Sequence, residues 1–188
     1  MGCALAKAAI DLGHDVVIVS GPVEVEYPFG SKVISVTSTE QMLEASRNVF
    51  SECNGMIGAA APCDYRPVKV KDDKIKKTGE PLVLHLIETP DVVATLGNEK
   101  RDGQWVVGFA LETEDQRFRA ITKLEKKSCN LIVLNGPEAI NSSTNQVEVI
   151  NHDGKIVATI QGSKEDVADG ILKFVQRRLI DDSSIDMQ

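Results

Sequence analysis

Short apolar runs rich in valine and isoleucine alternate with segments of helical periodicity along nearly all of this 188-residue chain. The run DVVIVS at 15–20 is typical of strands that are buried on both faces of a parallel sheet. Between such runs, apolar residues recur at helical spacing over stretches long enough for several turns. This alternation predicts an α/β domain with a doubly wound, mostly parallel, Rossmann-like sheet.

The expected elements follow from their boundary signals. We expect helices at 2–12, 38–53, 90–97, 114–127 and 163–179, and strands at 15–20, 32–36, 56–61, 82–87, 105–110, 130–134, 146–151 and 155–160. Ser38 followed three residues later by Gln41 forms a capping box. The last two strands flank the tripeptide HDG at 152–154, which favours a C-terminal β-hairpin. We therefore expect one domain at 1–179 and a disordered tail at 180–188.

The first element is unusual, because the chain opens on the helix expected at 2–12. A doubly wound domain ordinarily opens on a strand that becomes the centre of the sheet, followed by a phosphate-binding turn. Without that strand, the strands expected at 15–20 and 56–61 leave unpaired backbone groups on both sides of a gap. We therefore expect the first strand to be absent from this chain, unless another segment fills the gap.

Charge and composition exclude several classes of protein. Hydrophobic and charged contents of 42% and 26% are those of a globular domain, and the net charge of −7 argues against a nucleic-acid-binding protein. The four cysteines lack C-x-x-C spacing, so we expect reduced thiols and neither a zinc site nor a disulfide framework. With no apolar run of membrane-spanning length and no signal peptide, we expect a soluble, cytoplasmic protein.

A run of small residues leads into a lysine-rich stretch. The strand containing Gly58, Ala59 and Ala60 should end at the carboxyl edge of the sheet, where ligands bind in this fold class. Asp64 follows, where its carboxylate could hold a metal ion or a ligand hydroxyl. Lysines at 74, 76 and 77 could fold over a polyphosphate as a mobile lid. The alternative interpretation is a charged loop exposed to solvent.

Two further segments should reach the same edge. The helix opened by Pro90 and Asp91 would present free amide groups to an anion or a base. Phe109 ends the strand at 105–110, where it could be either core or ligand contact. Lys123 and Lys127 lie four residues apart and hence on one helix face, which is otherwise an ordinary solvated face.

Four motifs occur together in this order. They are A-A-x-x-D-Y-R-P at 60–67, K-I-K-K at 74–77, P-D-V-V at 90–93 and V-G-F-A-x-E-T at 107–113. Together they resemble the phosphopantothenoylcysteine synthetases, and the likeness runs from Met1 to about Val175. In bacteria this domain is commonly the carboxyl-terminal half of a bifunctional flavoprotein.

The resemblance implies a reaction in two steps. The carboxylate of 4′-phosphopantothenate attacks a nucleoside triphosphate, CTP in bacteria, and the resulting acyl cytidylate reacts with L-cysteine. The resemblance also implies that Mg²⁺ accompanies the triphosphate. It further implies that the chain forms a homodimer. The resemblance further implies that Lys74 is catalytic and that Lys77 is an auxiliary phosphate contact. The remaining nucleotide contacts that it implies are Gly58, Ala59, Ala60, Asp64, Pro90, Asp91, Val92, Val93, Phe109, Lys123 and Lys127, with Asp64 also near the cation.

The chain departs from the family pattern at its start. Members carry R-Y-x-T-N-x-S-S-G before the M-G-x-A-L-A helix, with a catalytic asparagine and phosphate-binding serines, whereas this chain begins at Met1. The flavin-dependent decarboxylase half is also absent, so we expect no FMN in this chain, although the native gene could fuse that half upstream. A non-catalytic nucleotide-binding module is the second hypothesis. An NAD-dependent reductase is disfavoured because no G-x-G-x-x-G follows a strand.

Overall fold

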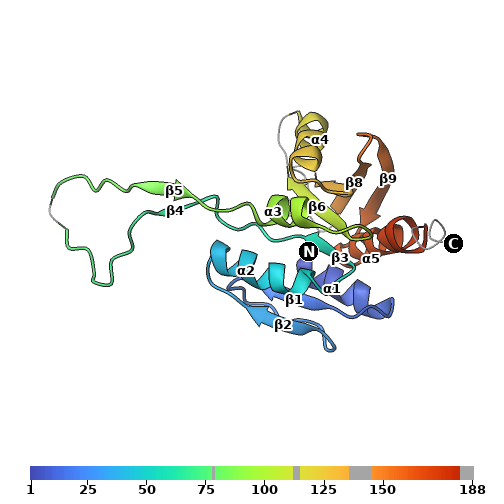
Figure 1. Cartoon of the computed structure of the whole chain (residues 1–188), viewed down its shortest axis with the longest axis horizontal. Helices are drawn as coiled ribbons and strands as arrows, with labels where there is room; N and C mark the ends of the chain where they lie inside the picture. Colours follow the sequence, from blue (N-terminus) through green and yellow to red (C-terminus); the bar gives the residue numbers. More distant parts are fainter. Residues whose placement is uncertain (78, 112–114, 136–144, 183–188) are drawn as a thin grey trace.

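A five-stranded sheet forms the centre of the computed structural model, which describes residues 1–77, 79–111, 115–135 and 145–182. Its strand order is β3 (Gly55–Gly58), β6 (Trp105–Leu111), β7 (Leu131–Asn135), β8 (Asn145–Asn151) and β9 (Ile156–Gly162) (Figure 1). The first three strands are parallel, and β8 and β9 form an antiparallel hairpin at the edge. The expected α/β fold, its mostly parallel sheet and the C-terminal hairpin are confirmed.

Two smaller sheets lie outside this one. Strands β1 (Val17–Ser20) and β2 (Lys32–Ser35) pair in parallel with each other and with no strand of the central sheet. Strands β4 (Tyr65–Pro67) and β5 (Leu86–Glu88) form a short antiparallel pair. The sheet is therefore interrupted between β1 and β3, at the place expected from the sequence.

Helices cover both faces of the central sheet. On one face, α1 (Gly2–Asp11) and α5 (Lys164–Val175) share an apolar cluster with Val107 of β6 and Val133 of β7. On the other face, α2 (Thr39–Phe50), α3 (Val92–Glu99) and α4 (Gln116–Lys126) share a second cluster with Val106 and Ile132. Successive strand residues point to opposite faces, so both faces of β6 and β7 are buried, which explains their continuous apolar runs.

The capping signals operate as expected. The Ser38 side chain accepts from the backbone N–H of Gln41, whose side chain in turn accepts from the Ser38 N–H, so the capping box that opens α2 is present. Ser163 opens α5 with a second capping box. Gly154 adopts a left-handed conformation, with φ of 71°, in the turn between β8 and β9.

Several boundaries differ from the expectations. The strand β3 ends at Gly58 rather than at residue 61, and the helix expected to begin at Pro90 begins after Asp91, whose side chain caps it. The last helix continues beyond Val175 as a π-helix, η2 (Gln176–Asp181), so residues 180 and 181 of the expected disordered tail are helical. Residues 183–188 lie outside the described residues.

The largest difference lies between β4 and β5. A strand was expected at 82–87, but pairing is confined to the residues nearest the domain, ending where the Val68 N–H donates to the His85 carbonyl. Side chains farther out, such as Val70 and Val83, are 76% and 72% exposed, so no packed layer fixes a longer register. We call residues 65–88 the arm; it extends away from the domain (Figure 1).

All four cysteines are free thiols, and burial raises the pKa of the Cys129 thiol to about 11. Among the described residues, no helix combines the length and the apolar character needed to cross a membrane.

Candidate functional site

The carboxyl end of β3 lies beside the middle of β6, with Gly58 opposite Gly108 in the ladder. Ala59 and Ala60 continue from β3, the first half-buried and the second exposed. Phe109 follows Gly108 and is partly buried against the apolar cluster under α1 and α5. Gly58 and Phe109 thus lie on neighbouring strands, and Ala59 and Ala60 follow directly after the end of β3.

Gly58 has a packing role that the sequence did not reveal. A Cβ atom at this position would lie 2.5 Å from Cγ2 of Val93 on α3. The expectation was that small residues leave room for a ligand, but at Gly58 the room is occupied by the first turn of α3. Beyond the end of the strand, Ala59 is partly buried against the apolar cluster of α1 and α5, and Ala60 is exposed.

The amino end of α3 carries a charged pair. The Asp91 carboxylate accepts from the Ala94 N–H at 3.0 Å and forms an ion pair with Lys127 Nζ at 3.0 Å. Burial disfavours the charged carboxylate, but the Ala94 N–H and the Lys127 ammonium outweigh burial and lower the pKa of Asp91. Two predicted contacts are therefore brought together, with the positive charge of Lys127 already compensated by Asp91.

The other predicted residues of this region differ in accessibility. Pro90 precedes the cap and is half-buried, whereas the Val92 side chain is only 6% exposed and belongs to the core. Lys123 lies one turn before Lys127 on α4 and is half-buried. Val92 can therefore meet a ligand only through its backbone.

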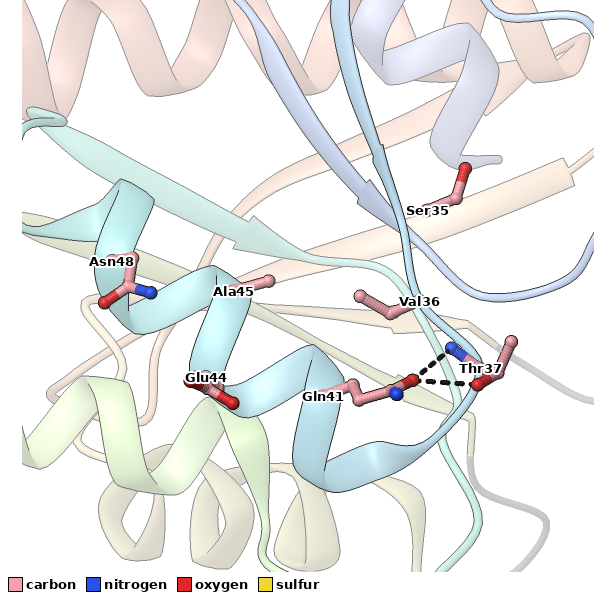
Figure 2. Close-up of a pocket in the computed structure, with 7 residues that line it drawn as sticks. All are labelled: Ser35, Val36, Thr37, Gln41, Glu44, Ala45 and Asn48. Atoms are coloured by element: carbon pink, nitrogen blue, oxygen red, sulfur yellow. Dashed lines mark hydrogen bonds between the residues drawn. The ribbon is translucent and has the colours of Figure 1, made fainter.

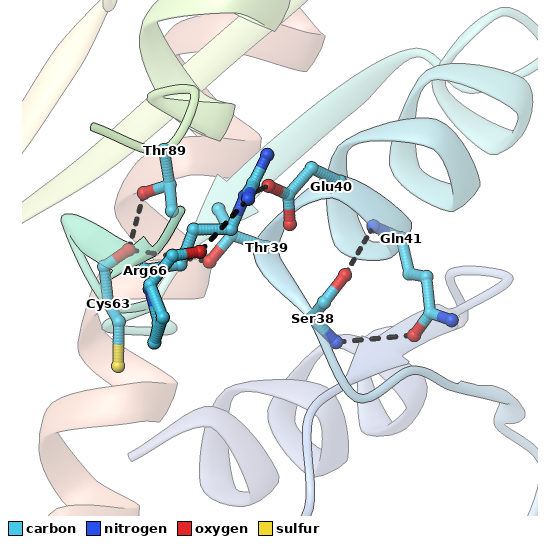
Figure 3. A network of polar contacts seen from close by, with 8 residues as sticks. Ser38, Thr39, Glu40, Gln41, Cys63, Arg66 and Thr89 are labelled. Carbon is cyan, nitrogen blue, oxygen red and sulfur yellow. Dashed lines mark hydrogen bonds and ion pairs between the residues drawn. The ribbon is translucent and has the colours of Figure 1, made fainter. Parts of the chain in front are cut away.

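The root of the arm is tied to the domain by hydrogen bonds (Figure 3). The Asp64 carbonyl accepts from the Thr89 N–H at 2.9 Å, and the Cys63 carbonyl accepts from the hydroxyls of Thr89 and Thr39. These contacts join the segment after β3, the segment before α3 and the first turn of α2. Asp64 is thereby held beside the segment before α3, with its side chain exposed.

An ion pair adds to this root. The Arg66 guanidinium on β4 binds the Glu40 carboxylate in the first turn of α2 (Figure 3). The Glu40 carboxylate accepts a hydrogen bond from the Glu40 backbone N–H and also contacts Arg66, and both interactions lower the pKa of Glu40. Glu40, Thr39 and Thr89 were not predicted as contacts of this region. Nothing in the local pattern around Glu40, for example, indicates that Arg66, 26 residues later, returns to bind it.

The lysines of the arm lie apart from this edge. Lys74 and Lys77 are exposed and belong to the stretch between β4 and β5 that extends away from the domain (Figure 1). The structure therefore places Asp64 at the root of the arm, beside Thr89, and does not bring Lys74 or Lys77 there. A contact between these lysines and a ligand at the edge requires the arm to bend.

The described residues contain no group of three or more His, Cys, Asp or Glu side chains that could hold a metal ion. Asp64 offers one exposed carboxylate directly before β4. Mg²⁺ in nucleotide sites commonly takes one or two protein carboxylates and completes its shell with phosphate and water. A single carboxylate fits a cation that arrives with a triphosphate better than a permanent metal centre.

Two buried asparagines were not predicted as site residues. Asn135 ends β7 beside the end of β6, and Asn145 begins β8. The side-chain oxygens of both are buried without a hydrogen-bond partner, and Asn145 is only 4% exposed. An asparagine directly after an apolar strand was the available signal for Asn135.

The described part of the chain also has an open cavity of about 440 Å³ away from this edge. It lies between the end of β2 and one face of α2, where the Gln41 side-chain oxygen accepts from the N–H and the hydroxyl of Thr37, both at 2.8 Å (Figure 2). None of the predicted site residues lines it, so the candidate site remains the edge formed by β3, β6, α3 and the arm.

Comparison with known proteins gives consistent matches. The family described as the DNA/pantothenate metabolism flavoprotein C-terminal domain matches residues 1–179. A protein named Cysteine/Cysteine sulfinic acid decarboxylase, from an unknown prokaryotic organism, is 39% identical over 180 residues, which is 93% of this chain and 50% of that protein. The Coenzyme A biosynthesis bifunctional protein CoaBC of Bacillus subtilis (strain 168) is 38% identical over 180 residues, which is 93% of this chain and 44% of that protein. The chain thus spans about half the length of the curated relatives it matches.

Solved structures give the same assignment. The C-terminal domain of the Coenzyme A biosynthesis bifunctional protein CoaBC matches with a TM-score of 0.78 and 33% identity, over 96% of this chain and 82% of that one. A Cab2 mutant in complex with phosphopantothenate-cysteine matches with a TM-score of 0.80 over 100% of this chain and 79% of that one, but at 14% identity this likeness shows the fold alone. Because the family match spans nearly the whole chain, this chain belongs to the DNA/pantothenate metabolism flavoprotein C-terminal domain family, the family of the phosphopantothenoylcysteine synthetase domains of coenzyme A biosynthesis.

Proposed function

We propose that this chain catalyses the CTP-dependent ligation of 4′-phosphopantothenate to L-cysteine. In the first step the pantothenate carboxylate attacks the α-phosphorus of CTP, and pyrophosphate leaves to give an acyl cytidylate. In the second step the cysteine amine attacks the acyl carbon, and CMP leaves to give phosphopantothenoylcysteine. The observation that supports this most is the meeting of the end of β3, the adjoining strand β6, the start of α3 and the root of a lysine-bearing arm.

The nucleotide would lie along this edge. Ala59 and Ala60 offer a surface without bulky side chains, and Phe109 lies on the neighbouring strand. Between Pro90 and Val93, the side chains pack against the domain, cap α3 or are buried. Recognition of the nucleotide by this segment would therefore rest on backbone groups. Preference for CTP over ATP would then come from the N–H and C=O pattern that meets the base.

The charge of the triphosphate would be met from two sides. Lys74 and Lys77 would reach the phosphates when the arm bends over the edge, and they would stabilise the negative charge that develops as pyrophosphate leaves. Asp64 at the arm root would hold the Mg²⁺ that accompanies CTP. That ion would supply neutralisation of the phosphate oxygens. The arm would also exclude water from the acyl cytidylate.

The test is pyrophosphate release by the purified chain with CTP, Mg²⁺ and 4′-phosphopantothenate, followed by CMP release on addition of cysteine. We expect release with CTP and not with ATP. Replacing the proposed catalytic lysine (Lys74→Ala) should lower kcat by about 10²–10³-fold, the scale of losing a transition-state charge partner. The matched control Lys71→Ala, exposed on the same arm, should change kcat by less than about threefold. Equal effects of both substitutions would contradict the role of Lys74.

The second candidate is a non-catalytic nucleotide-binding module. The interruption of the sheet between β1 and β3 favours it, because a site built on an incomplete sheet holds reacting groups less firmly. Calorimetry separates the two candidates. CTP binding without pyrophosphate release, and with the same affinity in Lys74→Ala, would support the module and oppose the enzyme.

We also propose that two copies associate and that the protein works in the cytoplasm. The exposed apolar side chains of the arm, among them Val70 and Val83, offer the kind of surface that a second copy would cover.

A further inference from the structure

Hydrogen bonds hold the place where the arm begins. The Cys63 carbonyl accepts from the hydroxyls of Thr39 and Thr89. The Asp64 carbonyl accepts from the Thr89 N–H at 2.9 Å. These bonds end at Cys63 and Asp64, directly before β4. They fix where the chain leaves the domain, whereas the direction of the paired strands β4 and β5, which we call the ribbon, depends on a contact made by the strands themselves.

Arg66 makes such a contact from β4. Its guanidinium binds the Glu40 carboxylate in the first turn of α2 (Figure 3). Arg66 lies opposite Ile87 of β5 in the ladder, and the neighbouring pair, Tyr65 and Glu88, is joined by a side-chain hydrogen bond at 3.4 Å. Successive side chains of a strand point to opposite faces. Arg66 therefore attaches one face of the ribbon to α2, while the Tyr65–Glu88 pair lies on the other face.

Glu40 is a firm point of attachment, because the first turn of α2 is held on both sides. The Ser38 capping box opens the helix, and Thr39 is only 8% exposed. The Gln41 side chain also accepts from the N–H and the hydroxyl of Thr37, both at 2.8 Å. A ribbon tied to Glu40 is thus tied to a part of the domain that has little freedom of its own.

The reach of Lys74 depends on the direction of the ribbon. The ribbon ends where the Val68 N–H donates to the His85 carbonyl at 2.9 Å. Lys74 lies six residues beyond Val68, a span of at most about 20–22 Å. A change of about 10° in the direction of the ribbon would move a group at that distance by about 3–4 Å, which is more than the length of a hydrogen bond.

We infer that Arg66 is a positioning residue: its ion pair with Glu40 sets the direction in which the arm leaves the domain, and thereby the place where Lys74 meets the triphosphate. The inference rests on the proposed function, in which Lys74 stabilises the developing phosphate charge. The two side chains of the pair are 45% and 42% exposed, so the pair contributes little to the stability of the fold. Its effect belongs to the rate, where a displacement of about 1 Å can cost about 10²-fold.

The first test is a double-mutant cycle on kcat for pyrophosphate release with CTP, Mg²⁺ and 4′-phosphopantothenate. Arg66→Met keeps a long side chain and removes the charge, and it should lower kcat by at least about tenfold. In the Lys74→Ala background the same substitution should lower kcat by less than about twofold, because Arg66 acts through Lys74. A residue with a merely structural role would lower kcat further in that background.

The conservative variant provides a rescue. The contact of Arg66 with Glu40 runs through Nε, so the single ammonium group of a lysine can replace it. Arg66→Lys should therefore keep kcat within about threefold of the unsubstituted chain. Glu40→Gln removes the charge of the same pair from the α2 side and should lower kcat as Arg66→Met does. It keeps the comparison possible if Arg66→Met does not fold.

Arg47→Met is the matched control. Arg47 lies on the same helix as Glu40 and forms an ion pair with Glu99 of α3 at 2.8 Å, with side chains that are 50% and 46% exposed. This pair has nearly the same exposure but does not involve the arm. Arg47→Met should change kcat by less than about threefold. A loss equal to that of Arg66→Met would overturn the inference, because it would assign the effect to a general loosening of α2.

A second measurement needs no catalysis. Residual dipolar couplings of the N–H groups of Arg66, Val68 and Ile87, read by NMR, report the direction of the ribbon relative to α2. In Arg66→Met these couplings should correspond to a rotation of about 10° or more, whereas the couplings within α2 should be unchanged. An unchanged direction of the ribbon would overturn the inference.

The kinetic outcomes separate this inference from the proposed function. If Lys74→Ala is slow but Arg66→Met keeps its kcat, or if the loss in Arg66→Met persists undiminished in the Lys74→Ala background, the positioning role is wrong and the proposed function stands. If Lys74→Ala keeps its kcat, the proposed role of Lys74 is wrong, and the positioning role of Arg66 is overturned with it.

Discussion

Single residues at close contacts decide how α3 and α4 fit together. A Cβ atom on Gly97 of α3 would lie 2.0 Å from the Lys127 carbonyl oxygen, at the end of α4. Because the obstacle is backbone, a rotamer change cannot relieve the clash. Glycine is therefore required here for packing, although Gly97 lies inside a helix where glycine is ordinarily unfavourable.

Gly97→Ala should lower the free energy of unfolding by about 1–3 kcal/mol, the range for overpacking a close contact. Urea denaturation monitored by circular dichroism measures this. Gly2→Ala is the matched control, because Gly2 is also helical and its Cβ would meet nothing within 4 Å. The control should be neutral or gain up to about 1 kcal/mol. Equal stabilities of the two variants would contradict the packing argument.

Asp91 acts both as the cap of α3 and as the ion-pair partner of Lys127. Asp91→Asn should keep the cap and lose the ion pair, at a cost of about 0.2–1 kcal/mol at pH 7, because the pair is partly exposed and screened. Asp91→Ala should lose both, at a further cost of about 1 kcal/mol.

The pH dependence follows from the lowered pKa of Asp91. The carboxylate stabilises the fold fully above its unfolded pKa of about 3.9, and this stabilisation disappears as the pH falls through the lower folded value. The difference in stability between the unsubstituted chain and Asp91→Asn should therefore be present at pH 7 and shrink in strong acid. Urea titrations of both proteins at pH 7 and in strong acid test this. A stability difference that grows toward acid would contradict it.

At the scale of elements, the arm is separable from the fold. Its strands pair only near the root, and its exposed side chains contribute nothing to either apolar cluster. The root, by contrast, is fixed to α2 and to the start of α3 through Arg66, Glu40 and Thr89. The described contacts that hold the arm to the domain thus lie at its root.

Replacing residues 69–84 by Asn-Gly should shorten the arm to a hairpin, because Val68 and His85 are already bonded and a two-residue turn suits such a pair. The Tm should change by less than about 2–4 °C, which corresponds to about 1 kcal/mol in a domain of this size. CTP-dependent pyrophosphate release should be abolished, since Lys74 is removed. A large fall in Tm would show that the arm supports the fold.

At the scale of the whole molecule, the outer part of the arm exposes apolar side chains such as Val70 and Val83. Sedimentation velocity should give the mass of two chains at micromolar concentration. Val83→Asp on the arm should weaken this association by at least about tenfold, whereas Val25→Asp, exposed on the loop after β1, should leave it unchanged. A monomer at all concentrations would contradict the dimer.

The local sequence determined the elements of the central domain and the family. β-branched runs, helical spacing and capping residues such as Ser38 and Ser163 act over a few residues, so they can be read without the fold. The interruption of the sheet was also predictable, because strand order in this fold class follows from chain order. The role that the motif at 60–67 implies for Asp64 stays a prediction.

Only the tertiary structure decided which residues meet. The contacts between Gly58 and Val93, Asp91 and Lys127, and Glu40 and Arg66 join elements that are distant in sequence, and their side-chain types alone do not indicate their partners. The extent of the arm strands was likewise undecidable, because Leu82 and its apolar neighbours have β propensity but no layer to pack against. Local propensity sets what a segment can become, and burial against other segments sets whether it does.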